Sequence, residues 1–170
     1  MITWGLLWGS AFAQDTVVPN ENLVVEGVPP ISKSLVEEIG LYTESRGAAF
    51  LSWHPARREM LIQTRFGDVP QIHQVKMPGG ARTQLTFFPE RVASANWRPG
   101  RGDGFIFSKD IGGNEFFQLY WKAAGTGKVS LLTDGKSRNT GGIFSRSGGK
   151  LAYESTKRTG KDTDIYWMNP

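Results

Sequence analysis

The sequence of 170 residues contains no cysteine and only two histidines, His54 and His73. The absence of cysteine excludes disulfide bonds, thiol catalysis and zinc sites built on cysteine. Beyond residue 13, no run approaches the roughly 20 apolar residues that a membrane-spanning helix requires. We therefore expect a mature chain without a membrane span.

A strong charge of one sign is also absent. The sequence has 20 basic and 16 acidic residues, a net charge of +4, and the basic residues are scattered in short groups such as Arg57-Arg58 and Lys157-Arg158. Nucleic-acid-binding domains usually gather Lys and Arg along one face or one helix. The charge pattern is therefore typical of a solvated surface, and we expect no nucleic-acid partner.

Glycine, in contrast, is abundant. The sequence has 21 glycines and 9 prolines, together with 39% apolar and 21% charged residues. The apolar fraction is that of a globular chain that can form a core. The frequent Gly and Pro residues predict many turns, and therefore short elements of secondary structure.

The N-terminal segment 1–13, "MITWGLLWGSAFA", is apolar and closes on Ala11-Phe12-Ala13. The small-x-small ending is typical of a signal-peptidase site, which predicts export to the periplasm or secretion from a bacterium. The segment is short and has no Lys or Arg before its apolar part. The alternatives are a translation start further upstream, or a buried N-terminal strand or helix.

Residues 14–46 form a lead-in that is polar and punctuated by proline before one short helical pattern. Ser32 is the expected N-cap and Gly40 the expected end of this helix. The apolar residues recur at helical spacing and predict one packing face. They are Leu35, Val36, Ile39 and Tyr42.

From Gly47 onward the sequence repeats itself. Trp53-His54-Pro55, Trp97-Arg98-Pro99 and Phe144-Ser145-Arg146 recur at intervals of 44 and 47 residues. Two further sets of positions agree with this period. They are Gln71, Gln118 and Asp164, at intervals of 47 and 46 residues, and Thr86 and Thr133, 47 residues apart.

A period of 40 to 50 residues with four short β-type runs per unit is typical of a β-propeller blade. We therefore predict an all-β fold, an incomplete β-propeller of four-stranded antiparallel blades at about 47–90, 91–137 and 138–170, preceded by a short helix. The third unit offers three runs before Pro170. A closed ring needs about four to eight blades, so we expect the chain to be a fragment of a longer protein.

The repeated aromatic residue ends the first run of each unit, at Trp53, Trp97 and Phe144. A bulky side chain at this place can fill the wedge between neighbouring blades. The Pro that follows twice removes a backbone donor and ends strand pairing. The pattern predicts an aromatic contact at each blade boundary.

These motifs resemble a known family. The Trp-x-Pro turn, "FFQLYW" (116–121), "DTDIYWM" (162–168), "QLTFFPERV" (84–92) and "LLTDGKSRN" (131–139) are similar to the N-terminal β-propeller of bacterial prolyl oligopeptidase family serine peptidases. The blades also resemble the propeller repeats of TolB, a periplasmic protein without catalysis of its own. The resemblance covers about residues 26–170.

The peptidase resemblance implies a C-terminal α/β-hydrolase domain with a Ser-Asp-His triad, acting on short peptides whose access the propeller restricts. This chain has no Gly-x-Ser-x-Gly elbow: Ser145 and Ser147, in "GGIFSRSGG", lack the strand-turn-helix context. His54 and His73 occupy repeat positions that hold Arg98 and Tyr120 in the next unit. We expect structural histidines and no catalytic residue in this chain.

The leading hypothesis is therefore a non-catalytic, substrate-gating propeller of an exported serine peptidase. The alternative is a TolB-like periplasmic module that binds a protein or peptide through its axial face. A propeller that handles carbohydrates or lipoproteins is a third possibility that rests on architecture alone.

Four other motifs favour structural roles. "AAGTGKVS" (123–130) lacks the spacing of a phosphate-binding loop, and Arg101-Gly102-Asp103 lies in an expected turn. The Glu37-Glu38 pair lies on the expected helix. In dipeptidyl-peptidase-like relatives, a glutamate pair on a propeller segment holds the free amine of the substrate. Asp162, Asp164 and Glu154 are too few for a calcium site. We therefore predict no catalytic, cofactor-binding or metal-binding residue, and no cofactor.

Overall fold

The computed structural model describes residues 15–170, so the signal-like segment 1–13 lies outside the described residues. Contacts within the chain divide it into two units, one ending at Ser45 and the other covering Arg46–Pro170. We describe each unit by itself. No helix in the described part of the chain is long and apolar enough to span a membrane.

The first unit contains one helix, α1 (Lys33–Thr43). Ser32 is its N-cap, as predicted, and the Ser32 hydroxyl accepts a hydrogen bond from the Leu35 amide at 3.3 Å. The predicted end at Gly40 is wrong, because the helix continues to Thr43 and the Gly40 carbonyl accepts from the Glu44 amide at 2.9 Å. A glycine inside a helix costs only about 1 kcal/mol, which three further residues of helix can offset.

The predicted packing face of α1 is exposed. Leu35, Val36 and Ile39 keep 45%, 48% and 47% of their surface accessible, and no residue of α1 is buried. Their helical spacing is correct, but the described residues of this unit do not cover them.

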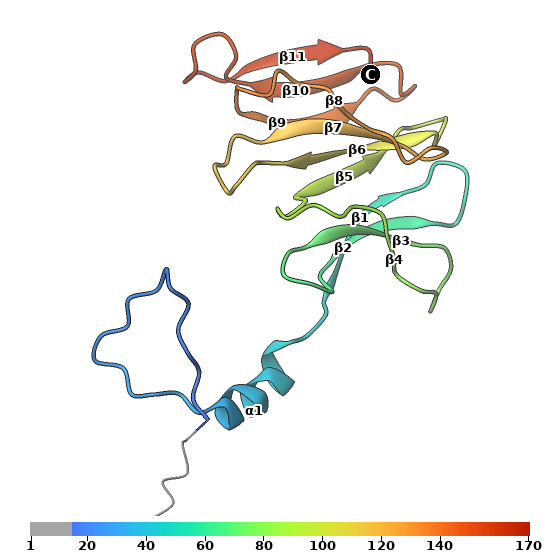
Figure 1. Cartoon of the computed structure of the whole chain (residues 1–170). Helices are drawn as coiled ribbons and strands as arrows, with labels where there is room; N and C mark the ends of the chain where they lie inside the picture. The colour runs from blue at the N-terminus through green and yellow to red at the C-terminus, as the bar shows by residue number, and fades with distance from the viewer. Residues whose placement is uncertain (1–14) are drawn as a thin grey trace, which may run out of the picture. The chain divides into compact units, whose positions relative to one another are not determined.

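The second unit consists of three antiparallel sheets in chain order (Figure 1). Neighbouring strands in each sheet are consecutive in sequence, as in a meander. The strands are β1 (Ala48–Trp53), β2 (Met60–Thr64), β3 (Gln71–Val75) and β4 (Thr83–Gln84) in blade 1; β5 (Ser94–Trp97), β6 (Gly104–Lys109), β7 (Gln118–Ala123) and β8 (Val129–Leu131) in blade 2; and β9 (Asn139–Phe144), β10 (Leu151–Ser155) and β11 (Asp164–Met168) in blade 3.

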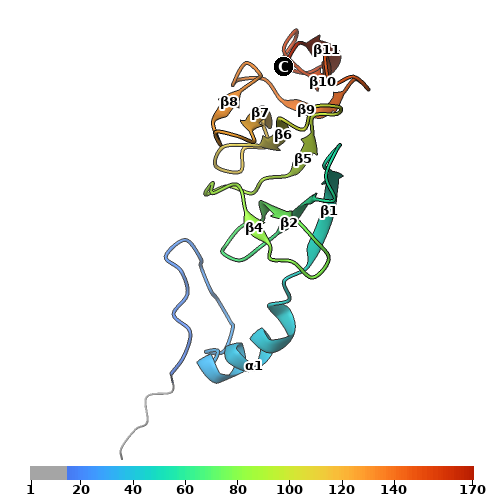
Figure 2. The same cartoon turned by 90° about the vertical axis from the view of Figure 1, so that its right-hand side faces the viewer.

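This architecture confirms the predicted propeller blades. Two sheets have four strands and the third has three, which matches the number of β runs predicted in each unit. Blade 2 lies between the other two blades, and the view turned by 90° shows the same succession (Figure 2). The strand β6 is buried along its whole length.

The interface between blades 1 and 2 contains the larger apolar core. Blade 1 contributes Leu61 and Ile72, which have no accessible surface. Blade 2 contributes a set of aromatic and aliphatic side chains that are at most 5% exposed. They are Val92, Ala95, Trp97, Phe105 and Phe107.

A second apolar core joins blade 2 to blade 3. Ile106 and Leu119 of blade 2 are each 2% exposed and pack with Leu151, which is fully buried. Half-buried side chains surround these three residues. They are Trp121, Leu132, Phe144, Tyr153 and Met168. Each blade therefore buries its apolar face against the next sheet.

The wedge prediction is confirmed for two of its three aromatic residues. Trp97 is 5% exposed in the core shared with blade 1, and Phe144 packs against the core shared with blade 2. Trp53 is 60% exposed, so the prediction is wrong there. The aromatic side chain faces the preceding blade, and no described sheet lies on that side of β1.

Candidate functional site

The residue after the wedge aromatic joins one blade to the next at two of the three places, after Trp53 and after Trp97. His54 packs edge-on against Trp97, with ring centroids 4.8 Å apart, and touches Gly102 in the β5–β6 turn of blade 2. At the equivalent place, Arg98 donates from Nε to the Gly148 carbonyl in the β9–β10 turn of blade 3, at 2.8 Å. Both glycines have positive φ, and neither has room for a Cβ atom. The joint therefore repeats with two different side chains.

His54 is held within this joint by its own turn and by Trp97. Its Nδ1 accepts from the Ala56 and Arg57 amides, each at 3.1 Å, which places the ring proton on Nε2. The Nε2 atom is buried without a hydrogen-bond partner in the described structure. The ring is thus a packed element of the joint.

His73, on β3, is 1% exposed and stacks at 5.2 Å from Phe66. Its Nδ1 lies 3.1 Å from the Gln71 carbonyl oxygen. Because a carbonyl oxygen only accepts hydrogen bonds, Nδ1 is the donor. Burial lowers the pKa of His73, and the charge of Arg82 acts in the same direction, while the bond to Gln71 opposes them. A buried neutral ring fits a structural role.

The repeated glutamine holds the connection between blades. Gln118 Nε2 donates to the Phe116 and Ser137 carbonyls, at 3.1 and 2.6 Å. Its Oε1 accepts from the Thr133 hydroxyl at 2.7 Å, the Gly135 amide at 3.0 Å and the Asn139 amide group at 3.0 Å. One buried side chain therefore fixes the whole crossover from β8 to β9.

Gln71 performs the same task between blades 1 and 2. Its Nε2 donates to the Phe88 and Glu90 carbonyls, each at 2.9 Å. The Glu90 carboxylate also pairs with the buried Lys109 ammonium at 3.0 Å, and this hydrogen bond is the main reason that the pKa of Glu90 lies below its usual value. The sequence anchors at Gln71 and Gln118 thus mark structural clamps.

The two candidate serines lie in the β9–β10 turn. Ser145 Oγ accepts from the Lys150 amide at 3.1 Å and lies 3.4 Å from Ser147 Oγ. No hydrogen bond in the described structure joins either serine to His54 or His73. The turn connects two antiparallel strands, so the strand-turn-helix geometry of a nucleophile elbow is absent from this place.

The acidic residues considered at the sequence level have other partners. Asp164 accepts from Arg158 Nε at 2.7 Å, and Glu154 accepts from the Thr140 hydroxyl at 3.0 Å. Among residues 15–170, no three His, Asp or Glu side chains gather as a metal site would require. Glu37 and Glu38 are both exposed on α1.

The tripeptide Arg101-Gly102-Asp103 lies in the β5–β6 turn, as predicted. Gly102 is buried against the His54 ring, and Asp103 lies 3.6 Å from the Arg98 guanidinium. Residues 124–128 form the turn that connects β7 to β8, and the Gly127 amide donates to the Ala123 carbonyl at 2.9 Å.

The inner strands of all three blades share one cavity of about 550 Å³. The side chains that precede the wedge aromatics line it, namely Ser52, Asn96 and Ile143. On a β-strand, neighbouring side chains point to opposite faces, so these three positions are directed away from the side that the aromatics would cover. The remaining lining residues are Trp53, Pro55, Trp97, Pro99, Gly141, Gly142 and Phe144.

The lining of this axial cavity, as we call it, is aromatic, aliphatic and proline-rich, with few polar groups. Trp53 and Ile143 expose 60% and 66% of their surface. The Ser52 hydroxyl accepts from the Trp97 amide at 3.2 Å, which fixes it. The half-buried Asn96 amide group has no hydrogen-bond partner in the described structure and is available to a ligand.

Sequence reasoning missed Ser52, Asn96 and Ile143. The available signal was positional: the residue before a wedge aromatic falls on the opposite face of the innermost strand. Its chemistry differs in every blade, whereas the aromatic is kept in all three units of this sequence. Such variation between repeats, next to a constant aromatic residue, is expected where a side chain does not pack between blades.

Comparison with known proteins identifies the fold. No protein-family model matches the sequence, and no curated protein matches it. The structure of TolB from Acinetobacter baumannii superimposes with a TM-score of 0.58 and 25% identity, over 73% of this chain and 30% of that one. A structure assigned to TolB from Agrobacterium tumefaciens gives a TM-score of 0.60 and 17% identity, over 82% and 48% of the two chains.

These similarities support a TolB-like β-propeller fold. The chain spans less than half of either TolB structure. They lend no support to a prolyl oligopeptidase parent, which stays a prediction from the sequence motifs.

Proposed function

We propose that this chain is part of a binding propeller that holds an extended segment of a protein partner in the axial cavity. The observation that carries the proposal is the shared lining by three successive inner strands. A mostly apolar cavity with a small number of polar groups is typical of ligand sites in proteins. The TolB-like fold of the blades supports a binding role.

The chemistry of the cavity favours an apolar, extended peptide. Trp53, Pro55 and Pro99 offer flat surfaces for aliphatic, aromatic or prolyl side chains, and aromatic-lined grooves commonly receive extended peptides. The Asn96 amide group can both donate to and accept from a peptide backbone. Gly141 and Gly142 of β9 also line the cavity.

The export predicted from residues 1–13 is consistent with this role, and we propose a periplasmic location. Fractionation of a bacterium that expresses the complete gene should place the protein in the periplasmic fraction. Its recovery with the cytoplasmic fraction would contradict the signal-like reading of that segment.

The fold neighbours support the binding module better than the peptidase-gating hypothesis. We expect no hydrolysis of aminoacyl or Xaa-Pro chromogenic substrates by these 170 residues. Turnover at the rates of serine enzymes would show that the nucleophile had been missed.

Panning a displayed library of random 12-residue peptides against the chain tests the binding role. We expect enriched apolar peptides whose affinity falls at least tenfold, by fluorescence anisotropy, in Trp53→Ala and in Asn96→Ala. Phe87→Ala is a matched control, because Phe87 is 76% exposed and does not line the axial cavity. Enriched peptides that bind Trp53→Ala as tightly as the original chain would place the site elsewhere.

A further inference from the structure

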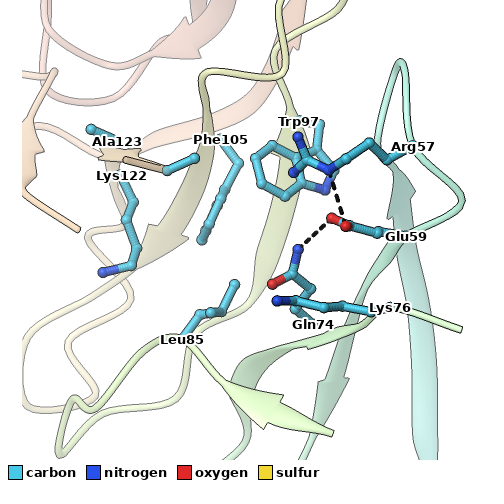
Figure 3. Close-up of a pocket in the computed structure, with 10 residues that line it drawn as sticks. Arg57, Glu59, Gln74, Lys76, Leu85, Trp97, Phe105, Lys122 and Ala123 are labelled. Carbon is cyan, nitrogen blue, oxygen red and sulfur yellow. Dashed lines mark hydrogen bonds and ion pairs between the residues drawn. The ribbon is translucent and has the colours of Figure 1, made fainter. Parts of the chain in front are cut away.

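A second cavity, of about 370 Å³, lies between blades 1 and 2 (Figure 3). We call it the interblade cavity. Its walls come from the β1–β2 turn, the end of β3 and the end of β7, whereas the axial cavity is lined by the inner strands. Only Trp97 contributes to both cavities.

The interblade cavity carries an excess of positive charge. Arg57, Lys76 and Lys122 line it, against a single carboxylate, that of Glu59. Glu59 is already engaged on both oxygens: Oε1 pairs with Arg57 Nε at 3.0 Å, and Oε2 accepts from Gln74 Nε2 at 2.7 Å (Figure 3). It is therefore not available to neutralise the two lysines.

Neither lysine has a carboxylate partner among residues 15–170. Lys122 Nζ donates to the Gly127 carbonyl at 2.9 Å, and Lys76 makes no side-chain hydrogen bond or ion pair in the described structure. The two ammonium groups belong to different blades, Lys76 at the end of β3 and Lys122 on β7. Both side chains line the same cavity.

The floor of the interblade cavity is apolar. Leu85, Trp97 and Phe105 line it, and Figure 3 shows Phe105 and Leu85 on the side opposite Glu59. Trp97 is 95% buried, and its indole N–H has no acceptor in the described structure. A buried donor without a partner costs stability.

We propose that the interblade cavity binds the C-terminal carboxylate of a peptide whose last side chain is apolar. The lysines hold the carboxylate, since charge-assisted hydrogen bonds are the strongest available to a carboxylate. The apolar side chain covers Leu85 and Phe105. The excess of cations repels a free α-ammonium group, so an acylated residue, as in a peptide, is favoured over a free amino acid.

This site is independent of the axial cavity, and its test uses different residues. Isothermal titration of the chain compares N-acetylleucine with N-acetylleucinamide, leucine, acetate and inorganic phosphate. We expect N-acetylleucine to bind at least tenfold more tightly than each of the others. The comparison with N-acetylleucinamide measures the contribution of the carboxylate. The comparison with leucine measures the repulsion of a free ammonium group, and the comparison with acetate measures the contribution of the apolar side chain.

The lysines are tested by Lys76→Met and Lys122→Met, each of which keeps a long side chain without its charge. We expect each to weaken N-acetylleucine about tenfold, while the control Lys161→Met, on an exposed turn of blade 3, has no effect. Circular dichroism and thermal unfolding check that the variants fold. If a variant fails to fold, the comparison of N-acetylleucine with N-acetylleucinamide in the unaltered chain still tests the proposal.

Three results would overturn the proposal. Equal affinity for the acid and the amide would show that the carboxylate is not recognised. Phosphate that binds as tightly as N-acetylleucine would show a general anion site without an apolar contribution. The absence of any binding at millimolar concentration would also overturn it, while leaving the peptide-binding role of the axial cavity untouched.

Discussion

Blades 2 and 3 are copies of one repeat, yet the same positions are buried in one and exposed in the other. Leu119 on β7 is 2% exposed, whereas Ile165, its counterpart on β11, is 81% exposed. Trp121 is half-buried under blade 3, and its counterpart Trp167 is 63% exposed. Blade 2 has a sheet on each face, while blade 3 has a described sheet on one.

The difference shows that a blade does not contain its own hydrophobic core. The apolar side chains of each sheet point to both faces, and they become buried only when a neighbouring sheet covers them. The interfaces between blades should therefore hold most of the free energy of unfolding of Arg46–Pro170. The predictions below compare a position in an interface with its uncovered equivalent.

The largest difference should come from the paired core positions. We expect Leu119→Ala to lower the free energy of unfolding by about 3 kcal/mol, because it leaves a cavity between blades 2 and 3. Ile165→Ala should change it by less than about 0.5 kcal/mol, since the side chain is already exposed. Urea denaturation followed by tryptophan fluorescence measures both. Similar losses in the two variants would mean that blade 3 is covered on both faces in solution.

The next largest loss of stability is expected at Gly148, the glycine of the joint between blades 2 and 3. A Cβ atom at Gly148 would lie 2.5 Å from the Pro99 carbonyl oxygen, whereas at Gly160 it would meet nothing within 4 Å. Both glycines have positive φ, of 70° and 78°. We expect Gly148→Ala to cost about 2–3 kcal/mol and Gly160→Ala about 1 kcal/mol, in the same denaturation experiment. Equal costs would show that backbone strain alone is responsible and that the joint adapts.

The repeat position held by Gln118 in blade 2 and by Asp164 in blade 3 gives the third comparison. Gln118→Met keeps the side-chain length but removes every hydrogen bond to the β8–β9 crossover, and we expect a loss of about 2 kcal/mol. The counterpart in blade 3, Asp164, pairs with Arg158 at the surface. Asp164→Asn should have a far smaller effect, because exposed ion pairs contribute little. Hydrogen exchange should show faster opening at Ser137 and Asn139 in Gln118→Met only.

The smallest effect concerns Asp134, in the crossover from blade 2 to blade 3. Burial raises its pKa, but hydrogen bonds from the Ser137 hydroxyl, the Ser137 and Lys136 amides and the Asn139 side chain outweigh this and lower the pKa to about 2. Stability from this carboxylate is therefore present above pH 3.8 and lost as the pH falls towards 2.

We expect Asp134→Asn to cost about 0.5–1 kcal/mol at pH 7, a value reduced for solvent screening because the residue is exposed. The gap between the two proteins should close as the pH falls from about 4 to 2, measured by urea denaturation at each pH. A gap that is independent of pH would mean that the ionised carboxylate is not the stabilising form.

Much of the fold could be predicted from the sequence because the repeat is local and periodic. Alternating apolar residues and turns rich in Gly identified each strand, and the intervals of Trp53, Trp97 and Phe144 identified the blades. The failures have different physical causes. The end of α1 was misplaced because a single glycine costs a helix too little to end it, whereas the exposure of Trp53 depends on what lies beside β1, which the local pattern does not state.

The candidate sites were less predictable. The axial cavity depends on Ser52, Asn96 and Ile143, which are about 45 residues apart in sequence and meet only because blades pack around a common centre. The interblade cavity likewise joins Lys76 to Lys122, and no spacing in the sequence marks them as neighbours. The anchors that the sequence did mark, Gln71 and Gln118, proved to be clamps between blades.

By itself, the amino-acid sequence determined the strand pattern, the number of blades in this chain and the turns, because each follows from apolar alternation and glycine within a few residues. Only the tertiary structure decided which apolar faces are covered, which polar side chains are already satisfied and where two cavities remain. These properties depend on contacts between blades, and the geometry of a contact between distant segments does not follow from the sequence of either segment alone.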